Sequence, residues 1–244
     1  MPPTFTALGS QSTPAILALY VKIGTCVLAI GADARRIVVA ERLQDGRLLV
    51  DALLAADRLV LLASLLELAA FAAAAVLFLR WQVVAHRNLP ALGEPEPRVG
   101  VGAGVAAWFV PVVNLLRPLQ VVGDLWRAGE RGTSVPAIFR VWWIAWLVAL
   151  AAVVAAWTLL GDAADVAERQ RIDALRAGAT ALSAAAAGLA LAVVSRTTRR
   201  QEARALALDA PRAAPPEARS DETAAPGALR VVSEEHARRS RPDA

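Results

Sequence analysis

Several residue types that carry chemistry in proteins are scarce in this chain of 244 residues. It has one cysteine, Cys26, one lysine, Lys22, and two histidines, of which only His86 lies near the long apolar runs. One cysteine excludes an intrachain disulfide and a cysteine-based metal cluster, and one histidine does not suffice for a familiar metal site. Because no Ser/His/Asp set or metal-ligand spacing is present either, we expect no catalytic residue, no metal and no cofactor.

Apolar residues, in contrast, are abundant. They make up 57% of the chain, and the mean hydropathy is +0.47. This excess over a soluble domain is concentrated in blocks, which indicates an integral membrane protein. The net charge is +4, but the arginines are scattered through loops and the tail and form no basic face with exposed aromatics. We therefore expect no nucleic-acid partner, and positive-inside topology accounts for the arginines better.

Four apolar runs are long enough to span a membrane, since about 20 residues cross a hydrocarbon core of roughly 30 Å. They comprise residues 14–32, 59–79, 142–160 and 177–194. Nothing basic precedes the first run, and Lys22 interrupts it. This pattern favours a retained span over a cleaved signal peptide.

A fifth run, residues 99–122, contains Pro111, Asn114, Arg117 and Pro118. Proline removes a backbone donor and disfavours helix at the residue before it, so this run predicts a broken element. It either spans the membrane as a fifth helix or forms a re-entrant or interfacial segment. The predicted fold class is therefore an all-α, polytopic membrane protein with four firm transmembrane helices and a Pro-broken central element.

Arginine counts leave two topologies open. Five spans with an outside N-terminus and four spans with an inside N-terminus both satisfy the positive-inside rule, and both place the C-terminal tail in the cytoplasm. The loops at 33–45 and 162–171 resemble each other in charge pattern, and each joins two spans. Two such hairpins on one side of the membrane slightly favour four spans.

The composition also predicts the domain boundaries. Residues 1–13 form a short N-terminal tail, 14–195 the helical membrane domain and 196–244 a basic tail. The tail is rich in Pro, Ala, Arg, Asp and Glu, which is typical of disorder, although 196–208 suits a short amphipathic helix.

Lys22 and Glu67 are charged residues near the middle of the first two spans. Each lies about 12 Å from the start of its span by helical rise, and the two spans are antiparallel. Since an isolated charge at this depth is costly, we expect an intramembrane ion pair between Lys22 and Glu67. A proton-relay or substrate role for Glu67, snorkelling and water exposure are the alternatives.

A second set of polar residues surrounds the central element. One hypothesis is a polar cluster that contacts lipid, with Arg87, Asn88 and Arg117 forming a site for anionic headgroups. We favour a structural role, in which Asn114 and Arg117 cap backbone groups released at the prolines and Asp124 pairs with Arg127 or Arg117. The complete set comprises Arg87, Asn88, Asn114, Arg117 and Asp124. Trp142, Trp143 and Trp146, at the start of the third firm span, suit an aromatic belt at the membrane interface.

An ordered series of motifs runs through the middle of the chain. The motifs are Phe-Leu-Arg-Trp at 78–81, Arg-Asn-Leu at 87–89, Trp-Phe-Val-Pro at 108–111, Asn-Leu at 114–115, Arg-Pro at 117–118, Leu-Trp-Arg-Ala at 125–128 and Trp-Trp-Ile-Ala-Trp at 142–146. This series resembles the bacterial membrane protein family called domain of unknown function 4328, and the resemblance covers about residues 58–195. The resemblance implies a multi-span bacterial membrane protein, with no activity that could be transferred to this chain.

Three classes of function fit these observations. We favour a non-enzymatic membrane interaction or scaffold protein in the bacterial plasma membrane. Its partners would be the lipid bilayer, anionic lipid headgroups and other membrane or envelope proteins. A small transporter or channel subunit with a site at the broken central helix is the alternative, since discontinuous helices often build such sites. A membrane enzyme is the weakest of the three.

Overall fold

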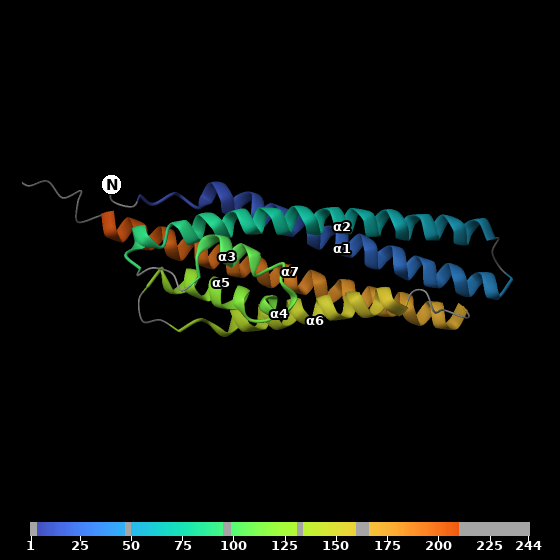
Figure 1. Ribbon diagram of the computed structural model, residues 1–244. Helices are drawn as coiled ribbons and strands as arrows, with labels where there is room; N and C mark the ends of the chain where they lie inside the picture. Colours follow the sequence, from blue (N-terminus) through green and yellow to red (C-terminus); the bar gives the residue numbers. More distant parts are fainter. Residues whose placement is uncertain (1–3, 47–49, 95–98, 131–133, 160–165, 210–244) are drawn as a thin grey trace, which may run out of the picture. The chain divides into compact units, whose positions relative to one another are not determined.

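The structure is a computed structural model that describes residues 4–46, 50–94, 99–130, 134–159 and 166–209. All regular elements in these segments are helices (Figure 1). The chain divides into two units at residues 208 and 209. The architecture below is that of the first unit.

Four long helices form the body of this unit. They are α1 (Gly9–Gln44), α2 (Val50–Arg87), α6 (Ala137–Leu159) and α7 (Val166–Asp209). All four are long and apolar enough to cross a membrane, and they contain the four predicted runs. With 36, 38 and 44 residues, α1, α2 and α7 would each exceed 50 Å at about 1.5 Å per residue, so they extend beyond a hydrocarbon core of roughly 30 Å. The prediction of an all-α polytopic protein is therefore confirmed.

Side-chain contacts fix the direction of three of these helices. Arg36, near the end of α1, pairs with Asp57 near the start of α2 and with Asp173 near the start of α7. At the other end, the backbone N–H of Gly9 donates to Glu202 near the end of α7 at 3.0 Å. Thus α2 and α7 both run antiparallel to α1. We call the end with Arg36 the hairpin end and the end with Gly9 the terminus end.

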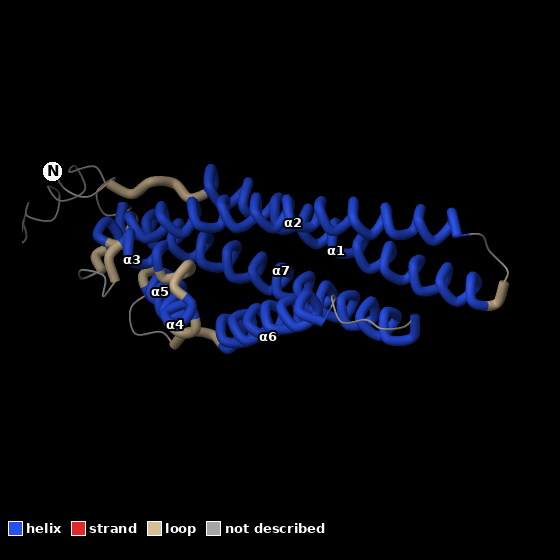
Figure 2. The backbone as a smooth tube through the Cα atoms, turned by 45° about the vertical axis from the view of Figure 1, so that its right-hand side comes forward, coloured by secondary structure: helices blue, strands red, loops and turns tan. Residues whose placement is uncertain are grey.

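The central segment does not form a long helix. It is divided into α3 (Val101–Ala106), α4 (Pro111–Asn114) and α5 (Arg117–Arg127), after a 3-10 turn at Pro90–Leu92. Both prolines lie in the first turn of a helix, α4 or α5, where a missing N–H costs nothing because those donors are unsatisfied in any helix. Each helix is too short to span a membrane. The predicted break is therefore confirmed, and the described residues form no fifth spanning helix; the segment packs against α2 and α6 at the terminus end (Figure 2).

An aromatic cluster holds this central segment in place. The Trp108 ring lies within 6.4 Å of the rings of Phe78, Trp142, Trp143 and Trp146, measured between centroids. Trp142 and Trp143 are only 2% and 3% exposed. The prediction that these two residues form a lipid-facing belt was wrong, because the indoles fill the core between α2, α6 and the central segment.

The first and last long helices extend into the segments that were predicted as tails. α1 begins at Gly9, and before it Leu8 is fully buried in the core. α7 continues to Asp209, beyond the predicted end of the membrane domain at residue 195. The helical alternative for residues 196–208 is the one observed. The rest of the predicted disordered tail, residues 210–244, lies outside the described residues.

Candidate functional site

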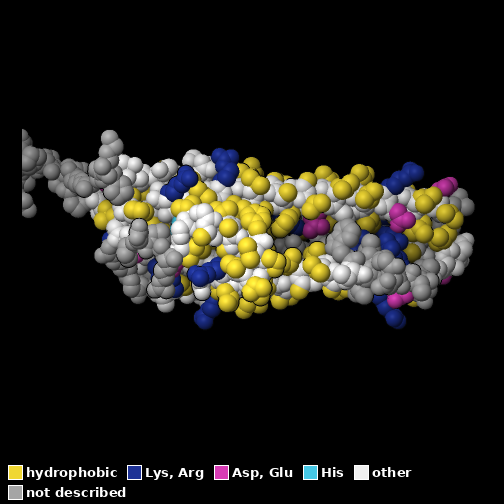
Figure 3. Space-filling view, viewed as in Figure 1, with side chains coloured by type: hydrophobic (Ala, Val, Ile, Leu, Met, Phe, Trp, Pro, Cys, Tyr) yellow, Lys and Arg dark blue, Asp and Glu magenta, His cyan; other side chains and the backbone are white. Residues whose placement is uncertain are grey.

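A groove of about 590 Å³ opens between α2 and α6 at the level of the apolar runs. Residues of α1 and α7 form its floor, and Trp108 and Phe109 line it at the terminus end. The molecular face in Figure 3 is largely apolar between its charged ends, yet an acidic side chain is visible in a hollow midway along it. Predominantly apolar pockets of 300–1,000 Å³ with a few convergent polar groups are typical ligand sites.

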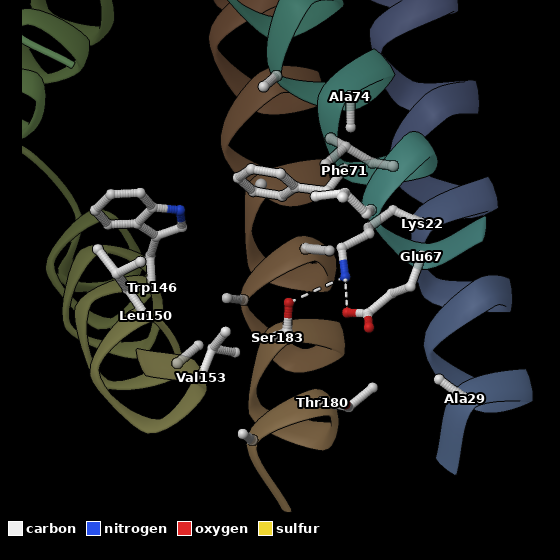
Figure 4. A pocket seen from close by; sticks show the side chains of 18 of the residues that line it. Lys22, Ala29, Glu67, Phe71, Ala74, Trp146, Leu150, Val153, Thr180 and Ser183 are labelled. Carbon is white, nitrogen blue, oxygen red and sulfur yellow. Dashed lines mark hydrogen bonds and ion pairs between the residues drawn. The ribbon is translucent and has the colours of Figure 1, made fainter. Parts of the chain in front are cut away.

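The polar centre of this groove is the pair Lys22–Glu67. The Lys22 Nζ lies 2.7 Å from the Glu67 Oε1, and the two side chains are 4% and 22% exposed. Lys22 also donates to the Ser183 Oγ at 3.1 Å (Figure 4). A third contact joins its Nζ to the Cys26 Sγ at 3.0 Å. An ammonium has three protons to donate, so Lys22 is saturated by these three partners. The ion pair expected from the sequence is thus present, with two additional ligands from α1 and α7.

Glu67 and Ser183 are not saturated. No donor reaches the Glu67 Oε2, and no acceptor takes the hydroxyl proton of Ser183, among the residues that the structure describes. Both side chains line the groove. The site therefore presents one acceptor and one donor, on two side chains that both contact Lys22, in surroundings where an unsatisfied polar group costs several kcal/mol.

The lining of the groove is polarised along its length. Aromatic residues lie toward the terminus end, and polar residues lie from the middle to the hairpin end. The aromatic set comprises Phe71, Phe78, Trp108, Phe109, Trp142 and Trp146, and the polar set comprises Lys22, Ser64, Glu67, Arg176, Thr180 and Ser183. An elongated ligand with one polar end would therefore have a preferred orientation in this groove.

The groove leads toward a buried ion network at the hairpin end. Its core is formed by two Asp-x-x-Arg motifs, Asp33 and Arg36 on α1 and Asp173 and Arg176 on α7. The two helices are antiparallel, so the motifs pair reciprocally: Arg36 with Asp173, and Arg176 with Asp33 at 3.5 Å. We call these four residues the Asp-Arg clasp.

Residues of α2 complete the network around the clasp. The Arg36 Nε lies 2.6 Å from Asp57, and the Arg176 side chain donates to the Ser64 hydroxyl at 3.0 Å. Asp33 and Asp173 are 1% and 0% exposed. The charges that join α1 to α7 are thus largely removed from solvent, which makes each partner sensitive to loss of the other, whereas the Asp57 side chain of α2 is 44% exposed.

The predicted polar cluster around the central element is not assembled as one site. Arg87 is exposed, whereas Asn88 is buried. The Asn88 amide accepts from the Thr6 N–H at 2.9 Å and donates to the Thr6 carbonyl at 2.8 Å. This side chain fastens the segment before α1 to the end of α2.

The other three members of that cluster lie on α4 and α5. Asp124 pairs with Arg127 at 2.7 Å, one of the two pairings expected. The residues that precede α4 and α5, Val110 and Leu116, provide no side-chain cap, and proline occupies the first turn of each helix. Capping by Asn114 and Arg117 stays a prediction. Arg117 is exposed, and the Asn114 Oδ1 is buried without a hydrogen-bond donor. In the described chain no hydrogen bond or ion pair joins Arg87 or Asn88 to these residues.

The chain of contacts from Ser183 to Lys22 to Glu67 has the order of a nucleophile, a base and an orienting carboxylate. Lys22, however, is an ammonium while it is paired with Glu67, and an ammonium has no lone pair with which to accept a proton. The arrangement is therefore better suited to binding than to activating Ser183. No group of three metal-ligand side chains is close enough to hold an ion within the described segments.

These features define a class of protein. Four membrane-length helices, many exposed leucines and valines on their outer faces and a laterally open groove describe a multi-span α-helical membrane protein. A family model described as "Domain of unknown function (DUF4328)" matches residues 44–199, and the chain belongs to this family. No curated protein and no solved structure matches the chain.

Sequence reasoning identified Lys22 and Glu67 but missed Ser183 and the Asp-Arg clasp. A signal was present in each case. Thr180 and Ser183 are the only hydroxyl side chains in the Ala-rich run 177–194, and the spacing Asp-x-x-Arg occurs at both 33–36 and 173–176. Neither pattern shows which residue Ser183 or Arg36 contacts, because these contacts join residues more than 130 positions apart in the sequence.

Proposed function

We propose that this chain is a non-enzymatic membrane interaction protein whose groove between α2 and α6 receives an amphipathic partner from the bilayer. The observation that carries the proposal is the pair of unsatisfied groups on Glu67 and Ser183 in an otherwise apolar groove. The bilayer core supplies no hydrogen bonds for such groups, so a bound partner stabilises them. The proposal predicts saturable binding without chemical turnover.

A bulky residue in the groove tests this proposal. Ala75 lines the groove, whereas the nearby Ala73 of α2 is exposed on the helix surface. We expect Ala75→Phe to abolish labelling of the groove by a photoactivatable lipid in nanodiscs, and Ala73→Phe to leave it unchanged. Labelled residues would be mapped by mass spectrometry. Equal labelling of both variants and the wild type would contradict groove binding.

A transporter or channel subunit is a second candidate, and one observation favours it. On α7, Asp173, Arg176, Thr180 and Ser183 are spaced by three or four residues, so they lie on one face of the helix. This polar line leads from the hairpin end to Lys22 and Glu67. Arg176, Thr180 and Ser183 of this line belong to the lining of the groove, whereas the sequence suggested a site at the broken central helix.

Flux measurements test this second candidate. If it is correct, the protein in liposomes carries a proton or ion flux that Glu67→Gln abolishes and that Glu41→Gln, an exposed control on α1, does not change. Absence of flux above protein-free liposomes would eliminate this candidate. Saturable labelling of the groove together with absence of flux would support the interaction protein.

We further propose that the protein lies in the plasma membrane with both tails in the cytoplasm. Both hairpin connections would then face outward, in agreement with the four-span arginine pattern. In a Cys26→Ser background, Glu41→Cys at the hairpin end should react with an impermeant maleimide added to intact cells. Arg87→Cys at the terminus end should react only after lysis. The opposite labelling pattern would invert the orientation.

A further inference from the structure

We propose that the groove recognises an uncharged amphiphile with a hydroxyl headgroup, held by Glu67 and Ser183 with its chain directed toward Trp108. This inference rests on the proposed groove binding and names the chemical class of the ligand. Four features support it: the hydrogen-bond donor and acceptor without partners, the net charge of the Lys22–Glu67 pair, the position of that pair in the apolar runs, and the place of the aromatic residues in the lining.

The hydrogen-bond acceptor and donor without partners at the site match the donor and acceptor of a hydroxyl group. Lys22 donates its three protons to Cys26, Glu67 and Ser183, so it has none for a ligand. The Glu67 Oε2 is able to accept a hydrogen bond from a ligand. Ser183, whose oxygen already accepts from Lys22, is able to donate one to a ligand. In Figure 4 dashed lines join the Lys22 ammonium to the Ser183 hydroxyl and to one oxygen of the Glu67 carboxylate, and no line reaches the second oxygen. An alcohol donates to the first group and accepts from the second.

Charge and depth exclude charged headgroups. Lys22 and Glu67 neutralise each other at 2.7 Å, so their pair favours neither an anion nor a cation. Both residues lie near the middle of their apolar runs, where bringing a phosphate, carboxylate or ammonium from the interface is costly. A neutral hydroxyl has a far smaller desolvation cost, and two hydrogen bonds at the site offset it.

The lining directs the chain of the ligand. From Glu67 to Phe78, α2 rises about 16 Å at 1.5 Å per residue. One leaflet of the hydrocarbon core is about 15 Å thick, half of the usual 30 Å. An ordinary lipid chain therefore extends from the Glu67 level to the aromatic lining formed by Phe78, Trp108 and Trp142. In the opposite direction it would meet Arg176 and Ser64.

The test compares three ligands on the full-length protein in nanodiscs. The probes are a long-chain alcohol brominated along its chain, the methyl ester of the corresponding acid and the acid itself. Bromine quenches tryptophan fluorescence at contact, and Trp108, Trp142 and Trp146 line the groove. We expect saturable quenching by the alcohol, with an affinity about tenfold higher than for the ester, which accepts a hydrogen bond but donates none. The acid should bind more weakly than the alcohol.

Two hydroxyl deletions sharpen this comparison. Ser183→Ala should lower the affinity for the alcohol about five- to tenfold. Thr25→Ala should change neither affinity, because the Thr25 hydroxyl donates to its own helix at the Lys22 carbonyl. The ligand series on the unmodified protein remains decisive if Ser183→Ala fails to fold.

The outcomes separate the two proposals. Equal saturable binding of alcohol and ester, lost in Ala75→Phe, would overturn hydroxyl recognition and leave groove binding intact. Tighter binding of the acid would also overturn it. Quenching that rises without saturation for every probe and persists in Ala75→Phe would overturn both proposals.

Discussion

The two ends of the helical bundle are held together by different chemistry. At the hairpin end, α1, α2 and α7 are joined by ion pairs among Arg36, Asp57, Asp173 and their neighbours. At the terminus end, Arg200 pairs with the exposed Glu130 at 2.8 Å and Glu202 accepts from the Gly9 N–H, whereas several buried or partly buried links are neutral. The Trp81 indole donates to Thr198, the Trp108 indole donates to Gln82, and the Gln201 amide donates to the Leu125 carbonyl.

The difference follows from how many backbone N–H and carbonyl groups at each end lack a hydrogen-bond partner within a helix. At the hairpin end, regular helices continue past the apolar runs, and their own backbone groups are already bonded. Charged side chains can therefore serve to join helices. At the terminus end, three short helices leave carbonyl and N–H groups without partners, and neutral indole and amide groups satisfy several of them. Buried ion pairs therefore join regular helices at the hairpin end, whereas neutral side chains bond to the broken backbone at the terminus end.

The largest expected effect is the loss of Arg36. Arg36→Met leaves Asp173 buried without its main partner and should lower the free energy of unfolding by about 3–5 kcal/mol. Arg35→Met, at the exposed neighbouring position, should stay within about 0.5 kcal/mol. Denaturant unfolding in micelles measures both. Replacing Arg36 by Met and Asp173 by Leu together should recover most of the lost free energy of unfolding. If Arg36→Met alone left this free energy unchanged, the clasp would not join the helices.

At the terminus end, Gln82→Leu should have a smaller effect. Gln82 accepts from the Trp108 indole at 2.9 Å and donates to the Gly104 carbonyl at 3.3 Å. The substitution leaves both groups unsatisfied and should lower the free energy of unfolding by about 2 kcal/mol. Gln120→Leu, on the exposed side of α5, is the control. A loss as large as that of Arg36→Met would remove the contrast between the two ends.

Asn88→Ala should act locally. It removes both hydrogen bonds to Thr6 and should increase the opening of residues 4–8 with a cost of about 1 kcal/mol. Faster amide hydrogen exchange in this segment, with unchanged exchange in α6, would show the effect. Arg87→Ala should leave the exchange unaltered. Unchanged exchange of residues 4–8 in Asn88→Ala would mean that Asn88 does not fasten the segment.

The smallest effect is expected for Arg127→Ala. Its pair with Asp124 lies within one helical turn, and the Arg127 side chain is half exposed. Such pairs contribute about 0–1 kcal/mol, so the melting temperature should shift little, and increasing salt should mimic the substitution. A loss of stability comparable to that of Arg36→Met would show that the exposure of an ion pair does not determine its contribution to stability.

Much of the fold could be predicted from the sequence, but only part of the candidate site. The four apolar runs, the break at Pro111 and the pairing of Lys22 with Glu67 follow from local composition and from the cost of a lone charge in lipid. The burial of Trp142 and Trp143 could not be predicted, since an indole at the start of a span suits either an interface or a core. Ser183 was missed for a related reason: a serine in an Ala-rich helix has no distinctive pattern until its partner is known.

Sequence alone determined that this chain is a multi-span helical protein with a broken central element, because helix length, hydropathy and proline act within a few turns of the chain. The tertiary structure decided which charges meet and where a groove remains. The Asp-Arg clasp joins α1 to α7, and Ser183 reaches Lys22 from a helix more than 150 residues away. Such contacts depend on how the helices are packed and rotated, and no local pattern of residues specifies that rotation.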